Sequence, residues 1–190
     1  IYGLRALNRK GTINNTKKGG MSMTEQTYHA DAQQKLDLMK QGAVLTTAFG
    51  GKVNTMVIGW GSIGYMWRLP IFTALVRQNR FTHGLLEKTG QFTVTFPTQD
   101  LPEALQICGT KSGRNMDKLA ACGLTVAPAR KIETPRLAVP GYHYECKVLY
   151  KTTMSAQDLD KAIKELWYEK EPGDYHTLYF GEILDSYQTH

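Results

Sequence analysis

The sequence has few cysteines, and they are not paired. Cys108, Cys122 and Cys146 are its three cysteines, and their spacing argues against a disulfide framework. There is no C-x-x-C motif and no histidine cluster, so we predict no metal site. We interpret Cys122 and Cys146 as small buried hydrophobic side chains, and we assign no redox chemistry to Cys108.

Long apolar runs and a secretory signal are also missing. No stretch approaches the roughly 20 apolar residues that cross a bilayer, and no apolar core precedes a small-residue cleavage site. We therefore expect no membrane association and, by default, a cytoplasmic location. The 190 residues, 42% hydrophobic and 21% charged, are typical of one soluble globular domain.

Acidic residues are absent from positions 1–20, although five basic residues lie there. Of the 23 basic residues these five leave 18, which face 17 acidic ones, so the net charge of +6 belongs mostly to this segment. We predict a flexible basic leader over 1–20, either added to the chain or upstream of its true start, before a single domain over 21–190. Binding of nucleic acid through the leader stays an alternative, but we expect no nucleic-acid partner.

Most of the predicted elements are strands. Two β-type runs around Gly50-Gly51 predict a hairpin, and the alternation of Phe92, Val94 and Phe96 predicts a half-buried strand. The predicted strands are 43–49, 53–60, 71–76, 91–96, 144–150 and 178–183.

Helices are predicted between these strands without a regular β-α alternation. One ends at Gly42, one is capped by Asn79, one begins at Asp100 with a capping box, and one begins at Ser155. This arrangement favours a mainly β fold, an antiparallel β-barrel with peripheral helices, over a doubly wound sheet.

The segment Gly59–Gly64 fits the G-x-G-x-x-G pattern, but no helix follows and no acidic residue stands about 20 positions on. A Rossmann site is therefore improbable. We interpret the glycines as allowing close approach of a flat ligand, with Trp60, Tyr65 and Trp67 as planar surface. A glycine-rich turn with core aromatics is the alternative.

Three further segments carry candidate chemistry. Arg77–Thr82 combines arginines with a helix start, which suits a phosphate monoester, although a capped helix with solvated arginines is common. The loop Cys108–Arg114 is not a P-loop but can wrap a polyol or phosphate. His176 is either a proton donor or a surface residue.

In their order, these motifs resemble those of flavin-reductase-like (flavoredoxin-type) FMN-binding proteins. The front half contributes Asn-Thr-Met, Gly-Trp-Gly-Ser, Val-Arg-x-x-Arg-x-Thr and Glu-x-x-Gly-x-Phe-x-Val. The back half contributes Gly-x-Lys-Ser-Gly-Arg with Asp117-Lys118, Tyr-x-Cys, and His-x-x-x-x-Gly-Glu-Ile. The similarity spans about residues 36–186.

The resemblance implies an FMN-binding split barrel, Greek-key-like and antiparallel, and a homodimer that completes two sites for non-covalent FMN. It also implies NAD(P)H as electron donor, an unidentified acceptor, and His176 as a catalytic candidate. A non-catalytic electron carrier, reduced by a protein partner, is the alternative. The implied cofactor-binding residues are Asn54, Thr55, Met56, Ile58, Gly59, Trp60 and Gly61 at the ring, Arg77, Asn79, Arg80 and Thr82 at the phosphate, and Lys111, Ser112 and Gly113 over the ribityl chain or phosphate.

Overall fold

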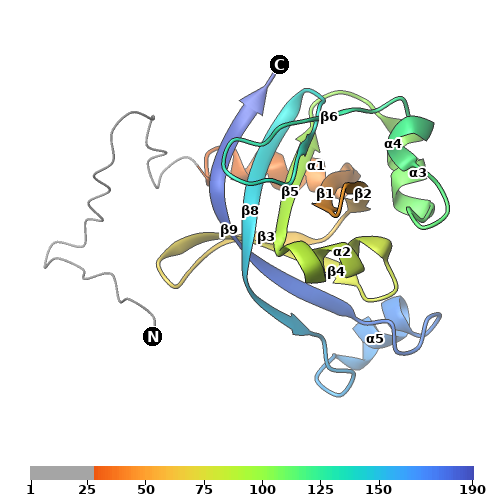
Figure 1. Ribbon diagram of the computed structural model, residues 1–190. Coiled ribbons are helices and arrows are strands. Elements are labelled where there is room, and N and C mark those ends of the chain that lie inside the picture. Colours follow the sequence, from red (N-terminus) through yellow and green to blue (C-terminus); the bar gives the residue numbers. More distant parts are fainter. Residues whose placement is uncertain (1–27) are drawn as a thin grey trace, which may run out of the picture.

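Seven strands form one antiparallel sheet in the order β2-β1-β5-β8-β9-β4-β3, in a computed structural model that describes residues 28–190 (Figure 1). The basic segment predicted as a leader, 1–20, lies outside the described residues. The seven strands are β1 (Ala43–Phe49), β2 (Lys52–Ile58), β3 (Gly61–Met66), β4 (Leu69–Arg77), β5 (Gln91–Pro97), β8 (Gly141–Thr153) and β9 (His176–Thr189).

Short helices flank this sheet (Figure 1). Figure 1 shows α3 and α4 together on one side, while α5 lies at the end where β8 and β9 are joined. None of the helices over residues 28–190 has the length and apolarity required to span a bilayer. The remaining elements are α1 (Ala32–Gly42), α2 (Phe81–Thr89), α3 (Pro102–Thr110), α4 (Lys118–Ala121), α5 (Lys161–Tyr168) and a small second sheet of β6 (Val126–Ala127) and β7 (Arg136–Leu137).

The core is enclosed by the curled sheet. Phe72 on β4 packs against Phe92 and Phe96 on β5, with ring centroids 6.4 and 6.1 Å apart, although two other strands separate β4 from β5 in the sheet. Side chains from opposite parts of the sheet can meet in this way only if the sheet curls around them. The predicted mainly β, antiparallel barrel with peripheral helices is confirmed.

Strand β3 is missing from the sequence-based prediction, which interpreted Gly59–Gly64 as a glycine motif that a flat ligand approaches, or as a glycine-rich turn. It pairs with β4 from Gly61 opposite Ala74 to Met66 opposite Leu69. Trp67 and Arg68 form the turn between them, with φ of 52° and 62°. Positive φ at both positions is the geometry of a two-residue hairpin, which usually has Asn-Gly there. The unusual turn residues explain why the hairpin was not predicted.

The sequence patterns predicted the first residues of the helices less well than they predicted the strands. Helix α3 begins after Leu101 with Pro102 in its first turn and no side-chain cap, so the predicted capping box at Asp100 is wrong. Helix α5 begins at Lys161 rather than near Ser155, because the Asp160 carboxylate accepts from the backbone N–H of Ala162 and Ile163. Asn79 is also not a cap, since Arg80 occupies the N-cap position of α2.

Candidate functional site

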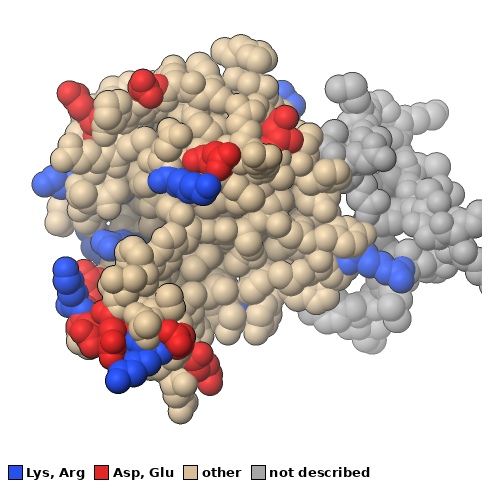
Figure 2. Space-filling model, turned by 180° about the vertical axis from the view of Figure 1, so that it is seen from behind, with Lys and Arg blue, Asp and Glu red and all other residues tan. Residues whose placement is uncertain are grey.

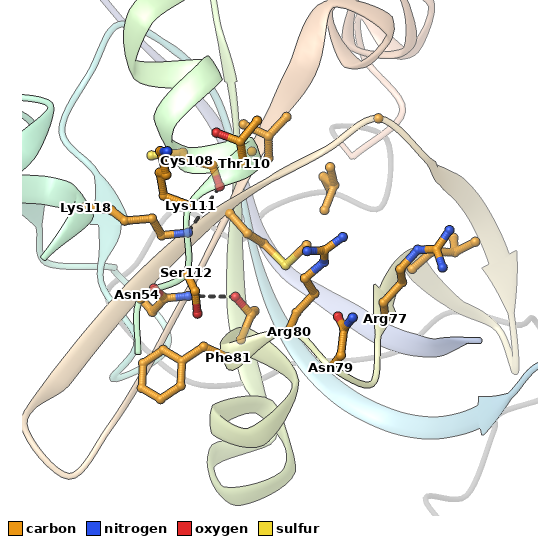
Figure 3. A pocket seen from close by; sticks show the side chains of 18 of the residues that line it. Asn54, Arg77, Asn79, Arg80, Phe81, Cys108, Thr110, Lys111, Ser112 and Lys118 are labelled. Atoms are coloured by element: carbon orange, nitrogen blue, oxygen red, sulfur yellow. Dashed lines mark hydrogen bonds between the residues drawn. The ribbon is translucent and has the colours of Figure 1, made fainter. Parts of the chain in front are cut away.

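A cavity of about 390 Å³ opens where the ends of β2 and β4 meet the start of α2, the loop after α3 and the end of α5 (Figure 3). Its volume lies in the range of sites for small organic ligands. The structure brings most of the predicted site residues to this one cavity. The predicted residues that line it are Asn54, Met56, Ile58, Gly59, Trp60, Arg77, Asn79, Arg80, Thr82, Lys111, Ser112, Gly113 and His176.

Two predicted residues, Thr55 and Gly61, are not among the lining residues. Thr55 is fully buried on β2, with its hydroxyl 3.4 Å from the Cys108 thiol. A Cβ on Gly61 would lie 2.9 Å from the Phe72 ring and 3.2 Å from the Met39 sulfur. The lack of a side chain at Gly61 therefore serves the barrel core.

A hydrogen bond and a glycine hold three separate segments together at the floor of the cavity. Asn54 Nδ2 on β2 donates to Thr82 Oγ1 on α2 at 2.7 Å, and both residues are buried. The loop after α3 lies directly against them, because a Cβ on Gly113 would be 2.0 Å from Asn54 Oδ1. Only glycine can occupy position 113 in this arrangement.

The loop side of the cavity is strongly cationic. The side chains of Arg80 and Lys111 are exposed and have no hydrogen-bond or ion-pair partner within residues 28–190. Arg114 Nη1 donates to the Asn79 carbonyl at 2.7 Å, and the buried Lys118 ammonium donates to the Cys108 carbonyl at 3.1 Å. Burial lowers the pKa of Lys118 below its usual range.

Within the part of the chain that the structure describes, no Asp or Glu lines this cavity. Helix α2 also begins at its edge, with Arg80, Phe81 and Thr82 in the lining. The first N–H groups of a helix have no partner within the helix and carry a partial positive charge. These groups and the nearby cations together suit an anionic ligand group such as a phosphate.

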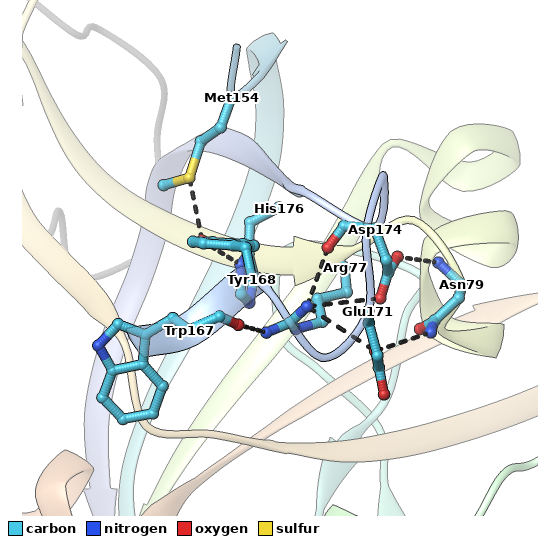
Figure 4. A network of polar contacts seen from close by, with 8 residues as sticks. All are labelled: Arg77, Asn79, Met154, Trp167, Tyr168, Glu171, Asp174 and His176. Carbon is cyan, nitrogen blue, oxygen red and sulfur yellow. Dashed lines mark hydrogen bonds and ion pairs between the residues drawn. The ribbon is translucent and has the colours of Figure 1, made fainter. Parts of the chain in front are cut away.

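Arg77 differs from Arg80 and Lys111 because its guanidinium is already bound within the protein (Figure 4). Nη1 donates to the Asp174 carbonyl at 2.9 Å, and Nη2 donates to the Trp167 carbonyl at 2.7 Å. The carboxylates of Glu171 and Asp174 lie 3.8 and 3.7 Å away, and the guanidinium stacks over the Tyr168 ring at 4.9 Å. Arg77 thus fixes α5 and the following loop to β4.

Asn79 takes part in the same attachment. Its backbone N–H donates to Asp174 Oδ1 at 3.0 Å, and its side-chain amide donates to Glu171 Oε2 at 3.3 Å (Figure 4). The sequence pattern predicted that Asn79 caps α2, and this is wrong because its side chain is held by the loop before β9 instead.

The end of the cavity opposite the cationic loop is aromatic. The Trp60 ring meets the Trp167 ring edge-on at 4.9 Å and the His176 ring at 5.0 Å. His176 Nδ1 lies 2.7 Å from the Tyr168 hydroxyl. Burial, followed by the nearby Arg77 charge, lowers the pKa of His176 to about 4. The imidazole is therefore neutral at pH 7, and it can donate one hydrogen bond and accept another without carrying charge.

Several lining residues were not among the predicted site residues. Arg114 and Lys118 belong to the Gly-x-Lys-Ser-Gly-Arg motif and the Asp-Lys pair that follows it. The whole of this segment, and not only residues 111–113, therefore carried the signal for the site. Trp167 had no such signal, because it lies on an amphipathic helix whose position over the cavity depends on Arg77. The missed lining residues are Val57, Leu75, Phe81, Cys108, Gly109, Thr110, Arg114, Lys118 and Trp167.

Comparison with known families gives one match over most of the chain. The model of the flavin reductase like domain matches residues 36–190. An uncharacterised protein of Archaeoglobus fulgidus is 29% identical over 133 residues, which are 70% of this chain but 64% of that protein. A protein of Pyrococcus abyssi is 27% identical over 141 residues, 74% of this chain and 69% of its own length. The chain thus spans under two thirds of the first relative.

Solved structures with the same fold include a flavoredoxin of Desulfovibrio vulgaris, with TM-score 0.60 and 22% identity over 78% of this chain and 69% of that one. An FMN-binding protein from Thermus thermophilus has TM-score 0.61 and 20% identity, covering 93% and 80% of the two chains. An NADH:FAD oxidoreductase of Streptomyces globisporus has TM-score 0.58 and 16% identity, covering 78% and 75%. At these identities the likeness establishes the shared split-barrel fold.

Proposed function

Since this chain belongs to the family of the flavin reductase like domain, we propose that it binds FMN non-covalently in the cavity described above and acts as an oxidoreductase. In this proposal NAD(P)H would be the electron donor, and bound FMN would supply the redox chemistry that links it to an acceptor. The observation that carries the proposal is the polarity of the cavity. One side has several cations and a helix start, while the other has Trp60, Trp167 and His176.

The residues that line the cavity fit FMN, which has an anionic phosphate at one end and a planar ring at the other. Arg80, Lys111, Ser112 and Arg114 would hold the phosphate and ribityl chain, together with the free N–H groups at the start of α2. Thr82 would contribute through the bond that orients Asn54. Arg77 and Asn79 would act mainly by keeping α5 in place beside the cavity.

The ring would lie along the backbone from Met56 to Trp60, where a Cβ on Gly59 would meet no atom within 4 Å. The open space at Gly59 allows close approach of a flat ligand. FMN, when bound, supplies the capacity to accept a hydride and to release electrons. Lys111 would favour negative charge on the ligand. Neutral His176 would offer a hydrogen bond to the ring or to the incoming nicotinamide.

A non-catalytic electron carrier is the second candidate, and the structural likeness to a flavoredoxin favours it. The two candidates differ in one observation, the response of the bound flavin to nicotinamide nucleotides. The experiment is a visible absorption spectrum of the purified protein, repeated without oxygen after NADPH and then NADH. Bleaching of a flavin spectrum supports the reductase, and flavin that stays oxidised supports the carrier. If no flavin is present and none is retained after incubation with FMN, the proposal fails.

We also propose that the protein works as a homodimer, because an aromatic cluster is exposed near the tip of the β3–β4 hairpin. Trp67 and Tyr150 are 57% and 51% exposed, and their rings pack with Phe180 at centroid distances of 5.5 to 6.3 Å. Figure 2 shows that charged side chains on one face gather mainly at the α5 end and are sparse elsewhere. An exposed aromatic cluster of this kind is typical of a protein interface.

A further inference from the structure

The structure brings together two cysteines that the sequence keeps apart. Cys108 lies in the last turn of α3, and Cys122 follows the short helix α4. The Cys122 thiol points at α3, where it donates to the Ala104 carbonyl at 3.9 Å. Ala104 lies one helical turn before Cys108, so the Cys122 sulfur reaches the turn of α3 that carries Cys108. The two thiols also affect each other directly, since Cys108 contributes to the raised pKa of Cys122.

We propose that Cys108 and Cys122 form a reversible disulfide, which makes this pair an oxidation site at the edge of the cavity. Cys122 is partly exposed, whereas only 2% of the Cys108 surface is accessible. The oxidant therefore meets Cys122 first, and Cys108 is the resolving thiol. Cys146, which is fully buried in β8 within the barrel core, takes no part.

The chemistry with hydrogen peroxide, a two-electron oxidant, is balanced as follows. The Cys122 thiolate attacks one peroxide oxygen, the O–O bond breaks, and a sulfenic acid and hydroxide are formed. The Cys108 sulfur then attacks the Cys122 sulfur, an S–S bond forms, and the sulfenic oxygen leaves as water. In total, two thiols and one peroxide give one disulfide and two waters. The sulfur atoms lose two electrons, and a reducing thiol returns them.

The environment explains when this reaction is fast. Burial, followed by the neighbouring Cys108 thiol, raises the pKa of Cys122 to about 11, while the Lys118 ammonium acts in the opposite direction. Only the thiolate reacts, so oxidation is slow at pH 7 and faster at pH 8.5. Lys118 donates to the Cys108 carbonyl at 3.1 Å, which keeps this cation beside the pair (Figure 3).

Closing the disulfide would alter the cavity, because Cys108 is part of its lining. The Cys108 sulfur now lies 3.4 Å from Thr55 Oγ1 on β2, and a bond to Cys122 turns it toward α4 instead. The loop that begins at Lys111 follows directly after α3, so its start moves with that helix. This consequence rests on the proposed function. On that basis, we expect oxidation to lower the affinity for FMN at least threefold.

The test treats the full chain with hydrogen peroxide at pH 8.5 and then counts free thiols and maps peptides without reduction. We expect the thiols to fall from three to one, with a Cys108–Cys122 cross-linked peptide that dithiothreitol removes. Cys122→Ser must abolish the cross-link, and Cys146→Ser must leave it unchanged. Three remaining thiols, a cross-link through Cys146, or a bond between two copies would overturn the proposal.

The consequence for the cavity is measured separately, as the dissociation constant of FMN before and after oxidation. Peroxide also oxidises methionine, and Met56 lines the cavity. The Cys122→Ser variant is therefore the matched control and should keep its FMN affinity after the same treatment. An equal loss of affinity in this variant would refute the effect of the disulfide. The thiol count decides the disulfide itself even if the protein binds no FMN.

Discussion

The Arg77 guanidinium donates to the main-chain carbonyl of Trp167 at 2.7 Å, which ties the end of β4 to the end of α5. The bond matters because Trp167 lies against Trp60 at the aromatic end of the cavity. α5 has few other attachments of this kind, since its side chains before Tyr168 are exposed. The position of one cavity wall thus depends on an arginine that belongs to another element.

Replacing Arg77 with Ala should loosen this wall and weaken FMN binding about tenfold or more. Removing the guanidinium leaves the carbonyl groups of Trp167 and Asp174 without their donor, and such hydrogen bonds from a charged group contribute about 1.5–3 kcal/mol. Fluorescence titration with FMN measures the affinity, and limited proteolysis without ligand measures the attachment of α5. If affinity falls while α5 stays protected, Arg77 contacts the phosphate directly. Unchanged affinity would contradict both roles.

The cationic loop should distinguish FMN from riboflavin, which lacks the phosphate. Arg80→Gln and Lys111→Gln each remove one exposed cation without burying an unpaired group. We expect each to reduce the preference for FMN over riboflavin about tenfold, which corresponds to about 1.4 kcal/mol. Arg130→Gln is the matched control, because Arg130 does not line the cavity. Equal preferences in all four proteins would refute the phosphate assignment.

His176→Gln should slow flavin reduction about tenfold while it changes FMN affinity less than threefold. The neutral imidazole offers a hydrogen bond near the ring, and such a bond matters more to the reaction than to phosphate-dominated binding. Stopped-flow absorbance after mixing with NADPH or NADH gives the rate. A variant as fast as the parent would remove His176 from the mechanism.

Stability should fall as the pH is lowered from 7 to 5. Burial is the main cause that lowers the pKa of both His143 and His176 to about 4, from 6.5 in an unfolded chain. Between these values the unfolded state binds more protons than the folded state, so acid favours unfolding. Together the two histidines lower the free energy of unfolding by about 2–4 kcal/mol at pH 5. Denaturant unfolding at several pH values measures this, and an unfolding free energy independent of pH would contradict it.

The homodimer is tested at the exposed aromatic cluster. Trp67→Ser should shift the protein toward the monomer in analytical ultracentrifugation, because a large apolar side chain is lost from the interface. Phe49→Ser removes another half-exposed aromatic side chain that is not part of the cluster, and it should leave the assembly unchanged. A parent protein that is monomeric at micromolar concentration would refute the proposal.

Sequence patterns determined the strands and the fold class. Alternation places Phe92, Val94 and Phe96 on one face of β5, and the structure buries all three in the barrel. Every residue between Ala43 and Phe49 was predicted as strand, and β1 has these bounds. Such patterns are local, so the sequence shows them directly. The sequence motifs near Asn54, Arg77 and Lys111 likewise contain most of the residues that line the cavity.

Tertiary structure alone decided what depends on partners that are distant in the chain. Asn79 has the side chain of a helix cap, but its amide donates to Glu171 instead, and its backbone N–H donates to Asp174. Gly61 fits a ligand-binding motif, but the Phe72 ring occupies the space beside it. Cys108 and Cys122 come together only because α3 and α4 pack side by side. A local sequence pattern shows which contacts a residue can make. Competition between partners that are distant in the chain decides which of these contacts forms.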